Sequence, residues 1–146
     1  MPTPPYLQKL VIIGVGLIGG SFALALRNAG LVKQIVGLGR SQENMLRARE
    51  LGIIDEIAIT PAAALAEADF VMLSTPVGQI QRVMAQIEPY LDKQTIVSDV
   101  GSTKQNVIEA AQQQLTNHLA HFRKLCSVWL KHISRIKRFN KFHIYC

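Results

Sequence analysis

At 146 residues, with 49% hydrophobic and 18% charged residues, the chain has the composition of one globular domain and not that of a disordered protein. No apolar run approaches the ~18 residues of a membrane span, and the N-terminus lacks the basic start of a secretory signal, so we expect a cytoplasmic protein. The net charge of +6 suggests a nucleic-acid partner, but residues 1–114 carry −1 (nine Lys/Arg, ten Asp/Glu) and residues 115–146 carry +7.

Short apolar runs and helix-forming runs alternate through residues 1–114. We expect strands at residues 10–13, 34–38, 57–59, 70–73 and 95–98. Helices are expected at residues 21–27, 41–51, 79–88 and 104–114, and one more is expected to begin at residue 61. Runs rich in Val, Ile and Leu are typical of parallel strands buried on both faces. The alternation predicts an α/β fold, a Rossmann-type doubly wound parallel sheet with right-handed crossovers.

The first strand is followed by Gly14-Val-Gly16-Leu17-Ile18-Gly19, which matches the pattern G-x-G-x-x-G. Gly14 permits the tight turn, Gly16 leaves room for a pyrophosphate, and Gly19 lets the following helix pack close to the strand. Backbone N–H groups at the start of that helix would bind the phosphates. A tight turn without a ligand is the alternative, but the strand–loop–helix context favours a dinucleotide-binding domain over residues 1–114.

The end of the second strand predicts which dinucleotide is bound. An NAD-binding protein usually has Asp or Glu there, to accept from the ribose 2′-hydroxyl. Here the sequence is Gly39-Arg40-Ser41, and the first acid is Glu43. Arg40 and Ser41 can both donate to a 2′-phosphate, so NADP is favoured over NAD. The alternative is that Arg40 is a solvated loop charge.

Two further loops follow strands and should lie at the carboxyl edge of the sheet, where ligands bind in open α/β folds. The loop after residue 73 contains Thr75 and Pro76, and the loop after residue 98 contains Asp99, Ser102 and Lys104. Ser102 offers a hydroxyl at the mouth of the crevice, and Lys104 can contact a phosphate or carboxylate. Local capping of strand ends explains Ser, Thr and Asp in such loops equally well.

Four segments occur together and carry a resemblance: residues 14–21, 40–41, 67–77 and 97–104. Over residues 7–114 the chain resembles the N-terminal domain of the prephenate/arogenate (cyclohexadienyl) dehydrogenase family of tyrosine biosynthesis. The resemblance implies oxidative decarboxylation of a cyclohexadienyl acid with hydride transfer to NAD(P)⁺. It also implies that Ser102 is the catalytic serine beside the nicotinamide and the substrate hydroxyl, and that Thr75 and Pro76 line the cofactor.

The chain departs from this family after Gln114, where a Gly-His-Pro segment with the catalytic histidine and then a helical substrate and dimerisation domain would follow. None of the four histidines beyond Gln114 has such neighbours, so none is assigned that role. We therefore expect a truncated, cofactor-binding fragment that binds NADP(H) without turnover. The resemblance implies a homodimer for the full-length family, while the oligomeric state of this fragment and the choice between prephenate and arogenate both stay open.

The tail, residues 115–146, has two interpretations. As a helix it would show an apolar stripe beside basic residues, a form that can bind acidic lipids or nucleic acid. A shifted reading frame or a truncated gene is favoured, because the composition changes abruptly where the family continues. Scattered His and Cys spacing predicts no metal site there.

Three functions are compared on this basis. The favoured one is a dehydrogenase fragment that binds NADP(H), with no membrane or nucleic-acid partner. The alternative is a stand-alone NADP(H)-binding sensor whose basic helix contacts a partner. Another dehydrogenase family, such as a β-hydroxyacid enzyme, is a weaker option, because the segment from Asp99 to Lys104 is typical of prephenate dehydrogenases.

Overall fold

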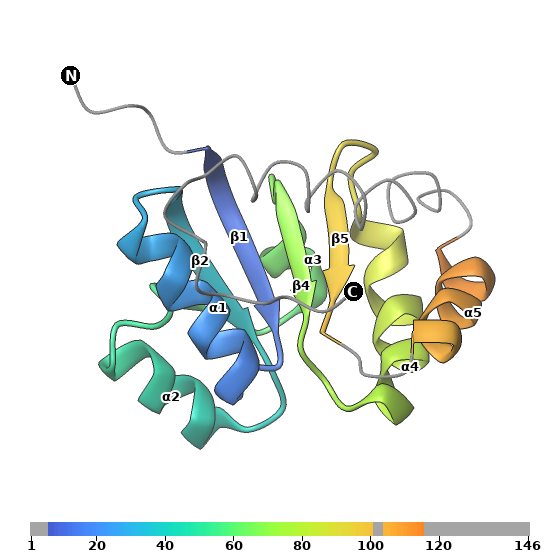
Figure 1. Ribbon diagram of the computed structural model, residues 1–146, viewed down its shortest axis with the longest axis horizontal. Helices are drawn as coiled ribbons and strands as arrows, with labels where there is room; N and C mark the ends of the chain where they lie inside the picture. Colours follow the sequence, from blue (N-terminus) through green and yellow to red (C-terminus); the bar gives the residue numbers. More distant parts are fainter. Residues whose placement is uncertain (1–5, 101–103, 116–146) are drawn as a thin grey trace.

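The computed structural model describes residues 6–100 and 104–115, and its strands all belong to one parallel sheet (Figure 1). The strands are β1 (Leu7–Ile13), β2 (Val32–Leu38), β3 (Glu56–Ile57), β4 (Phe70–Leu73) and β5 (Ile96–Asp99). Their order across the sheet is β3-β2-β1-β4-β5. The chain thus builds outward from β1 to one edge and then crosses back to build the other half, which is the doubly wound arrangement predicted from the sequence.

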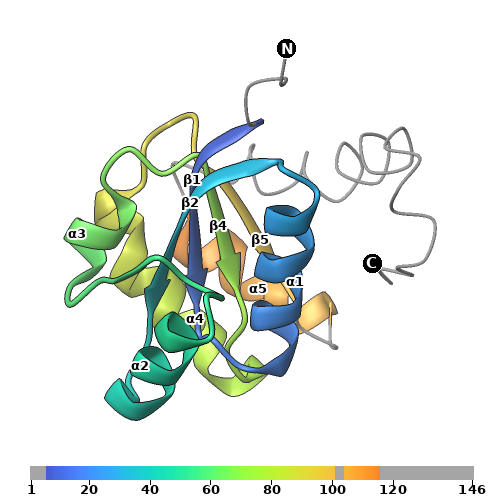
Figure 2. The same cartoon turned by 90° about the vertical axis from the view of Figure 1, so that its left-hand side faces the viewer.

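Helices cover both faces of this sheet. They are α1 (Leu17–Asn28), α2 (Gln42–Glu50), α3 (Pro61–Leu65), α4 (Val77–Ile87), the 3₁₀ turn η1 (Glu88–Tyr90) and α5 (Lys104–Gln114). Figure 2 shows α1 on one side of the sheet and α3 on the other. This two-sided cover explains why the strands read as unbroken apolar runs instead of alternating ones.

Two buried clusters, one on each face, hold these layers together. Leu10 and Ile12 of β1 pack with residues of α1 and α2, while Val11 and Ile13 pack with residues of α3, α4 and α5. Successive side chains of a strand point to opposite faces, so a single four-residue run contributes to both cores. Leu115, fully buried and hydrogen-bonded through its N–H to Ala111, belongs to the second cluster, one residue past the predicted domain boundary.

The observed bounds of several helices and strands agree with the predicted ones, and the differences lie next to the starts of α1 and α3. Strand 70–73 and helix 104–114 have the predicted bounds. The predicted strand 57–59 is instead 56–57, because Thr60 caps α3 through its hydroxyl and the chain turns before it. Helix α1 begins at Leu17, not at Ser21, because the Gly20 N–H already bonds to the Gly16 carbonyl at 2.9 Å. The second half of the glycine motif therefore lies inside the helix.

Candidate functional site

The site lies where the direction of chain building reverses, between the adjacent strands β1 and β4. Loops that follow these two strands diverge to opposite faces, which leaves a crevice at the carboxyl edge of the sheet. A cleft of about 600 Å³ occupies this edge, within the size range of small-molecule sites. Its walls come from the loops after β1, β2 and β4 and from one side of α4 with η1.

Hydrogen bonds fix the loops around this cleft. The first residue after β1, Gly14, donates its N–H to the Leu38 carbonyl at the end of β2, at 2.8 Å. Ser74, the first residue after β4, donates in the same way to the Ile13 carbonyl at 2.8 Å. Each loop therefore leaves the sheet from a position set by the neighbouring strand, which makes the cleft part of the rigid scaffold.

The three glycines of the motif meet different surroundings. Gly14 has φ +85°, and a Cβ there would lie 2.7 Å from the Ser74 carbonyl oxygen. A Cβ on Gly19 would lie 2.8 Å from Ser74 Oγ, so this glycine permits close packing of α1 against the loop after β4. At Gly16 a Cβ would meet nothing within 4 Å, and Gly16 lines the cleft. The space beside Gly16 is open to a ligand.

The first turn of α1 faces this opening with its backbone. The N–H groups of Leu17 and Ile18 have no hydrogen-bond partner among residues 6–100 and 104–115, and the first turn contains no acidic residue. The side chains of Leu17 and Ile18 are 87% and 59% exposed and do not line the cleft. Free N–H groups at the positive end of a helix dipole form an anion-binding site.

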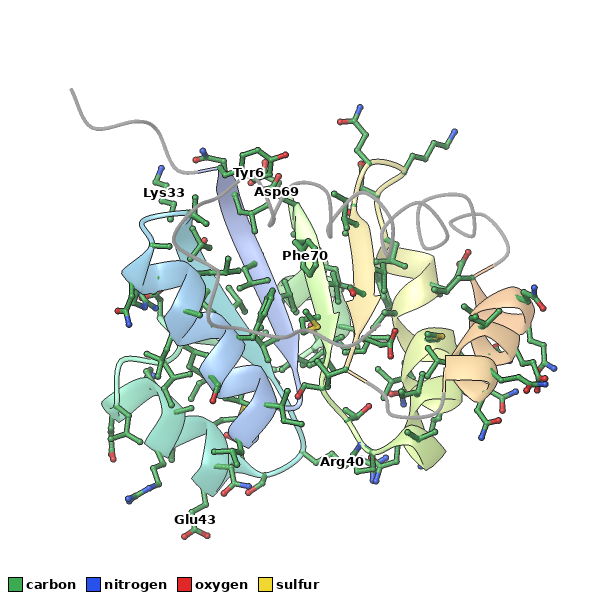
Figure 3. All side chains as sticks on the ribbon, viewed as in Figure 1. Tyr6, Lys33, Arg40, Glu43, Asp69 and Phe70 are labelled. Carbon is green, nitrogen blue, oxygen red and sulfur yellow. The ribbon has the colours of Figure 1, made fainter. Side chains whose placement is uncertain are left out.

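A second part of the cleft is built by the loop between β2 and α2. Arg40 lines it and makes no ion pair within the described part of the chain. The Ser41 hydroxyl caps α2 by accepting from the Asn44 N–H at 3.3 Å, so its own proton remains available to donate. Figure 3 shows Arg40 at the carboxyl edge of the sheet, whereas Glu43 points away into solvent. Among the described residues that line the cleft, none is acidic.

Two glycines near this loop contact methionine. A Cβ on Gly39 would lie 2.7 Å from the terminal methyl of Met45, and one on Gly37 would lie 3.3 Å from its sulfur. Met45 is buried, and it lines the cleft together with Gly39. The methionine therefore occupies the space that a side chain at the end of β2 would take.

The loop after β4 contributes Thr75 and Pro76 to the cleft. Thr75 Oγ1 is buried and has no hydrogen-bond partner among the described residues. A buried hydroxyl without a partner costs free energy, so this atom fits a ligand that supplies the missing hydrogen bond. Pro76 precedes the first residue of α4 and ends the extended loop.

The predicted site is thus brought together only in part. Gly14, Gly16, Arg40, Ser41, Thr75 and Pro76 all line one cleft, while Gly19 acts through packing. Ser102 lies outside the described residues, as does all of the predicted tail after Leu115. Asp99 is the last residue of β5 and lies at the carboxyl edge of the sheet.

Sequence reasoning missed the wall formed by α4 and η1. The missed residues line the cleft on one side of this segment: Gln79, Val83, Gln86, Ile87 and Tyr90. Their spacing of three and four is the signal that places them on one helical face. Pro61 at the start of α3 completes this wall.

Residues 6–100 and 104–115 show neither a metal-binding cluster nor a membrane-spanning helix. They contain no group of three His, Cys, Asp or Glu side chains placed to hold a metal ion. Within residues 6–100 and 104–115, none of the helices combines the length and apolarity needed to span a membrane.

Comparison with known proteins agrees with this geometry. The family described as prephenate dehydrogenase, nucleotide-binding domain, matches residues 22–122, which is more than half of the chain. Prephenate dehydrogenase of Bacillus subtilis is 36% identical over 109 residues, which are 74% of this chain and 29% of that protein.

Two solved structures are similar in both sequence and fold. Prephenate dehydrogenase from A. aeolicus, solved with hydroxyphenyl propionate and NAD⁺, has a TM-score of 0.69 at 36% identity, over 74% of this chain and 38% of that one. Synechocystis arogenate dehydrogenase has a TM-score of 0.67 at 33% identity, over 73% and 37%. The chain thus spans between about a quarter and two fifths of the length of these relatives. It belongs to the family of prephenate dehydrogenase nucleotide-binding domains.

Proposed function

We propose that this chain supplies the nucleotide-binding part of a dehydrogenase that oxidatively decarboxylates a cyclohexadienyl acid, and that it binds NADP(H) in preference to NAD(H). The observation that carries the proposal is the open, uncapped start of α1 beside Gly16, at the edge where β1 and β4 diverge. Because the chain spans 29% to 38% of its relatives, the reaction is proposed for the longer protein and nucleotide binding for these residues.

The described residues fit a dinucleotide along the cleft. Backbone N–H groups of Leu17 and Ile18 would hold the pyrophosphate, and Gly16 would lie against it. Thr75 Oγ1, which lacks a hydrogen-bond partner, would pair with a polar group on the nicotinamide side. A dinucleotide held by these residues would supply the acceptor for the hydride that leaves the hydroxyl-bearing ring carbon of the substrate, and loss of carbon dioxide would make the substrate ring aromatic.

Ser102 is proposed to orient the substrate hydroxyl. It follows β5 by three residues, and β5 pairs with β4, so its loop starts at the same edge as the Thr75 loop. A hydroxyl there would position the substrate without being consumed. Relatives include both a prephenate and an arogenate dehydrogenase, and the choice between these acids is left to residues beyond this domain.

The preference for NADP(H) is supported by the end of β2. Among the described residues Arg40 has no ion-pair partner, Ser41 has a proton to donate, and the cleft lining holds no carboxylate to accept from a ribose 2′-hydroxyl. A guanidinium matches the planar, doubly donating geometry that phosphate favours. The A. aeolicus relative was solved with NAD⁺, so this preference is a property proposed for the present sequence.

Titration of NADPH and NADH by calorimetry tests the proposal. We expect the native chain to bind NADPH more tightly by about tenfold or more, since charge-assisted hydrogen bonds contribute ~1.5–3 kcal/mol. Arg40→Asp should reverse the order, because it removes a donor and adds an acceptor for the 2′-hydroxyl. Arg82→Asp, the same charge change at an exposed position of α4, is the control and should leave the order unchanged. Absence of binding by either nucleotide contradicts the proposed function.

A further inference from the structure

We infer that residues 116–146 cover the outer face of α1, the side of this helix that points away from the sheet. This contact lies within the chain, so it goes beyond the proposed nucleotide binding and does not depend on it. It gives a place in the molecule to the apolar stripe of the tail, for which nucleotide binding has no use.

Helix α1 is apolar on its outer side as well as on the side that packs against the sheet. Its buried side consists of small or apolar residues: Gly19, Gly20, Ala23 and Leu26. After Leu17 the first charged residue is Arg27, in the last turn. The Leu17 side chain is 87% exposed and that of Ile18 is 59% exposed. A helix that is apolar all round is typical of one that is covered on every side.

Helix α2, in the same layer, shows how a solvent-facing helix of this domain is built. It contributes Met45 and Ala48 to the same buried cluster as α1. Its exposed positions include charged residues of both signs: Glu43, Arg47, Arg49 and Glu50. The two helices therefore bury similar surfaces and differ on their outer sides. Only the outer side of α1 has the composition of a surface that another segment covers.

The tail lies outside the described residues, and its sequence carries a complementary pattern. Apolar residues recur at spacings of three and four: Phe122, Leu125, Trp129, Ile133 and Ile136. In helical form these residues share one side. Most of the basic residues between and after them fall on the opposite side: Arg123, Lys124, Lys131, Arg135 and Arg138. The tail can thus place its apolar side against α1 and leave these cations in solvent.

The connection through the chain favours this occupant over a second copy. Leu115 is buried in the cluster on the other face of the sheet, and the tail starts there. Residues 116–121 can extend ~20 Å and a helix over residues 122–139 would be ~27 Å long, whereas five strands are about 24 Å wide. A tethered segment has an effective concentration in the millimolar range, roughly a thousandfold above that of a second copy at micromolar concentration.

Trp129 is the only tryptophan of the chain and lies within the apolar stripe, so its fluorescence reports this contact. In the native chain without nucleotide, we expect its emission to lie to the blue of its emission in urea and its quenching by acrylamide to be weaker. Leu17→Arg should return both readouts to their values in urea, because a cation on this face repels the basic tail and would lose its hydration under it. A hundredfold dilution should leave the native emission unchanged, since the contact is intramolecular.

Leu46→Arg is the matched control, because it makes the same change at an exposed leucine of α2, and it should keep the native emission. Both variants should unfold cooperatively in urea, since both leucines are exposed. Emission of Trp129 in the native chain equal to that in urea would show that the tail is not covered. Blue-shifted emission retained in Leu17→Arg would place the tail elsewhere, and a blue shift lost on dilution would assign this face to a second copy. Each of these three results overturns the inference.

Discussion

Three glycines of one motif have different physical reasons to be glycine. Gly14 has a positive φ and faces a backbone carbonyl 2.7 Å from its missing Cβ, and Gly19 faces the Ser74 side chain at 2.8 Å. Gly16 faces open space. The first two are therefore required for folding, and only at the third would the proposed ligand be the reason for glycine.

Replacing two of these glycines should separate folding from binding. Gly14→Ala is expected to lower the free energy of unfolding by about 2–4 kcal/mol, because strain at φ +85° adds to a steric clash with Ser74. Gly16→Val should leave the urea unfolding midpoint nearly unchanged and reduce NADPH affinity at least tenfold. Equal destabilisation by both variants would contradict the assignment.

For a substitution at Thr75 we predict that stability rises while nucleotide affinity falls. Its buried Oγ1 has no partner, so Thr75→Val should raise the free energy of unfolding of the ligand-free chain by about 1 kcal/mol. The same change should weaken nucleotide binding ~5–10-fold by removing the hydroxyl that the ligand pairs with. Thr75→Ser keeps the hydroxyl and is expected to bind as the native chain does. Thermal unfolding with and without NADPH measures both effects, and a loss of stability in Thr75→Val would count against this account.

Helices and strands of this domain could be predicted well because local signals agree with the fold. Ser41 and Thr60 each cap the helix that follows, as their positions before helix-forming runs predict. The predicted start of α1 is too late, because Gly19 and Gly20 lower helix propensity although close packing against Ser74 requires glycine at position 19. Local propensity does not contain that packing term.

The glycine motif after β1 and the end of β2 could be predicted as parts of the site, because each consists of residues that are neighbours in sequence. The α4 wall could not, because Gln86 and Tyr90 line the same cleft as Arg40 only through the arrangement of strands across the sheet. A helical periodicity shows that these residues share a face, and nothing in it tells whether the face is covered by protein or by ligand.

A single carboxylate joins two neighbouring strands at the opposite edge of the sheet. Asp69, just before β4, accepts hydrogen bonds from the N–H groups of Gln8 and Lys9 in β1, at 2.6 and 2.8 Å. Figure 3 shows Asp69 at this edge, far from Arg40. Because β1 and β4 also form the ligand crevice, this bond pair supports the site from a distance.

Asp69→Ala should therefore lower the free energy of unfolding by about 2–3 kcal/mol, since two hydrogen bonds to a charged acceptor are lost. Asp92→Ala is the control, because within the described part of the chain the Asp92 carboxylate accepts one local bond, from the Gln94 N–H, and its loss should cost less than about 1 kcal/mol. Chemical denaturation measures both variants. A cost for Asp69→Ala no larger than that for Asp92→Ala would show that this link between β1 and β4 is not important.

Across the entire domain, the cleft draws on elements from both sides of the sheet. The start of α1 belongs to one helical layer and α4 to the other, and their cores are separate clusters. A dinucleotide held along the cleft would contact both layers and the loops between them. Binding should accordingly stabilise the folded chain by RT ln(1 + [L]/Kd), about 2.7 kcal/mol at a hundredfold excess over Kd.

The position of Met45 beneath the end of β2 has a consequence for how the proposed cofactor preference can change by mutation. The Cβ of an aspartate or glutamate at position 39 would lie 2.7 Å from the terminal methyl of Met45, which is the far end of a flexible side chain. Thioether side chains yield readily to such intrusion. The proposed preference for NADP(H) is therefore open to reversal by a carboxylate at position 39, because the Cβ of such a residue would meet only the side chain of Met45 at close range.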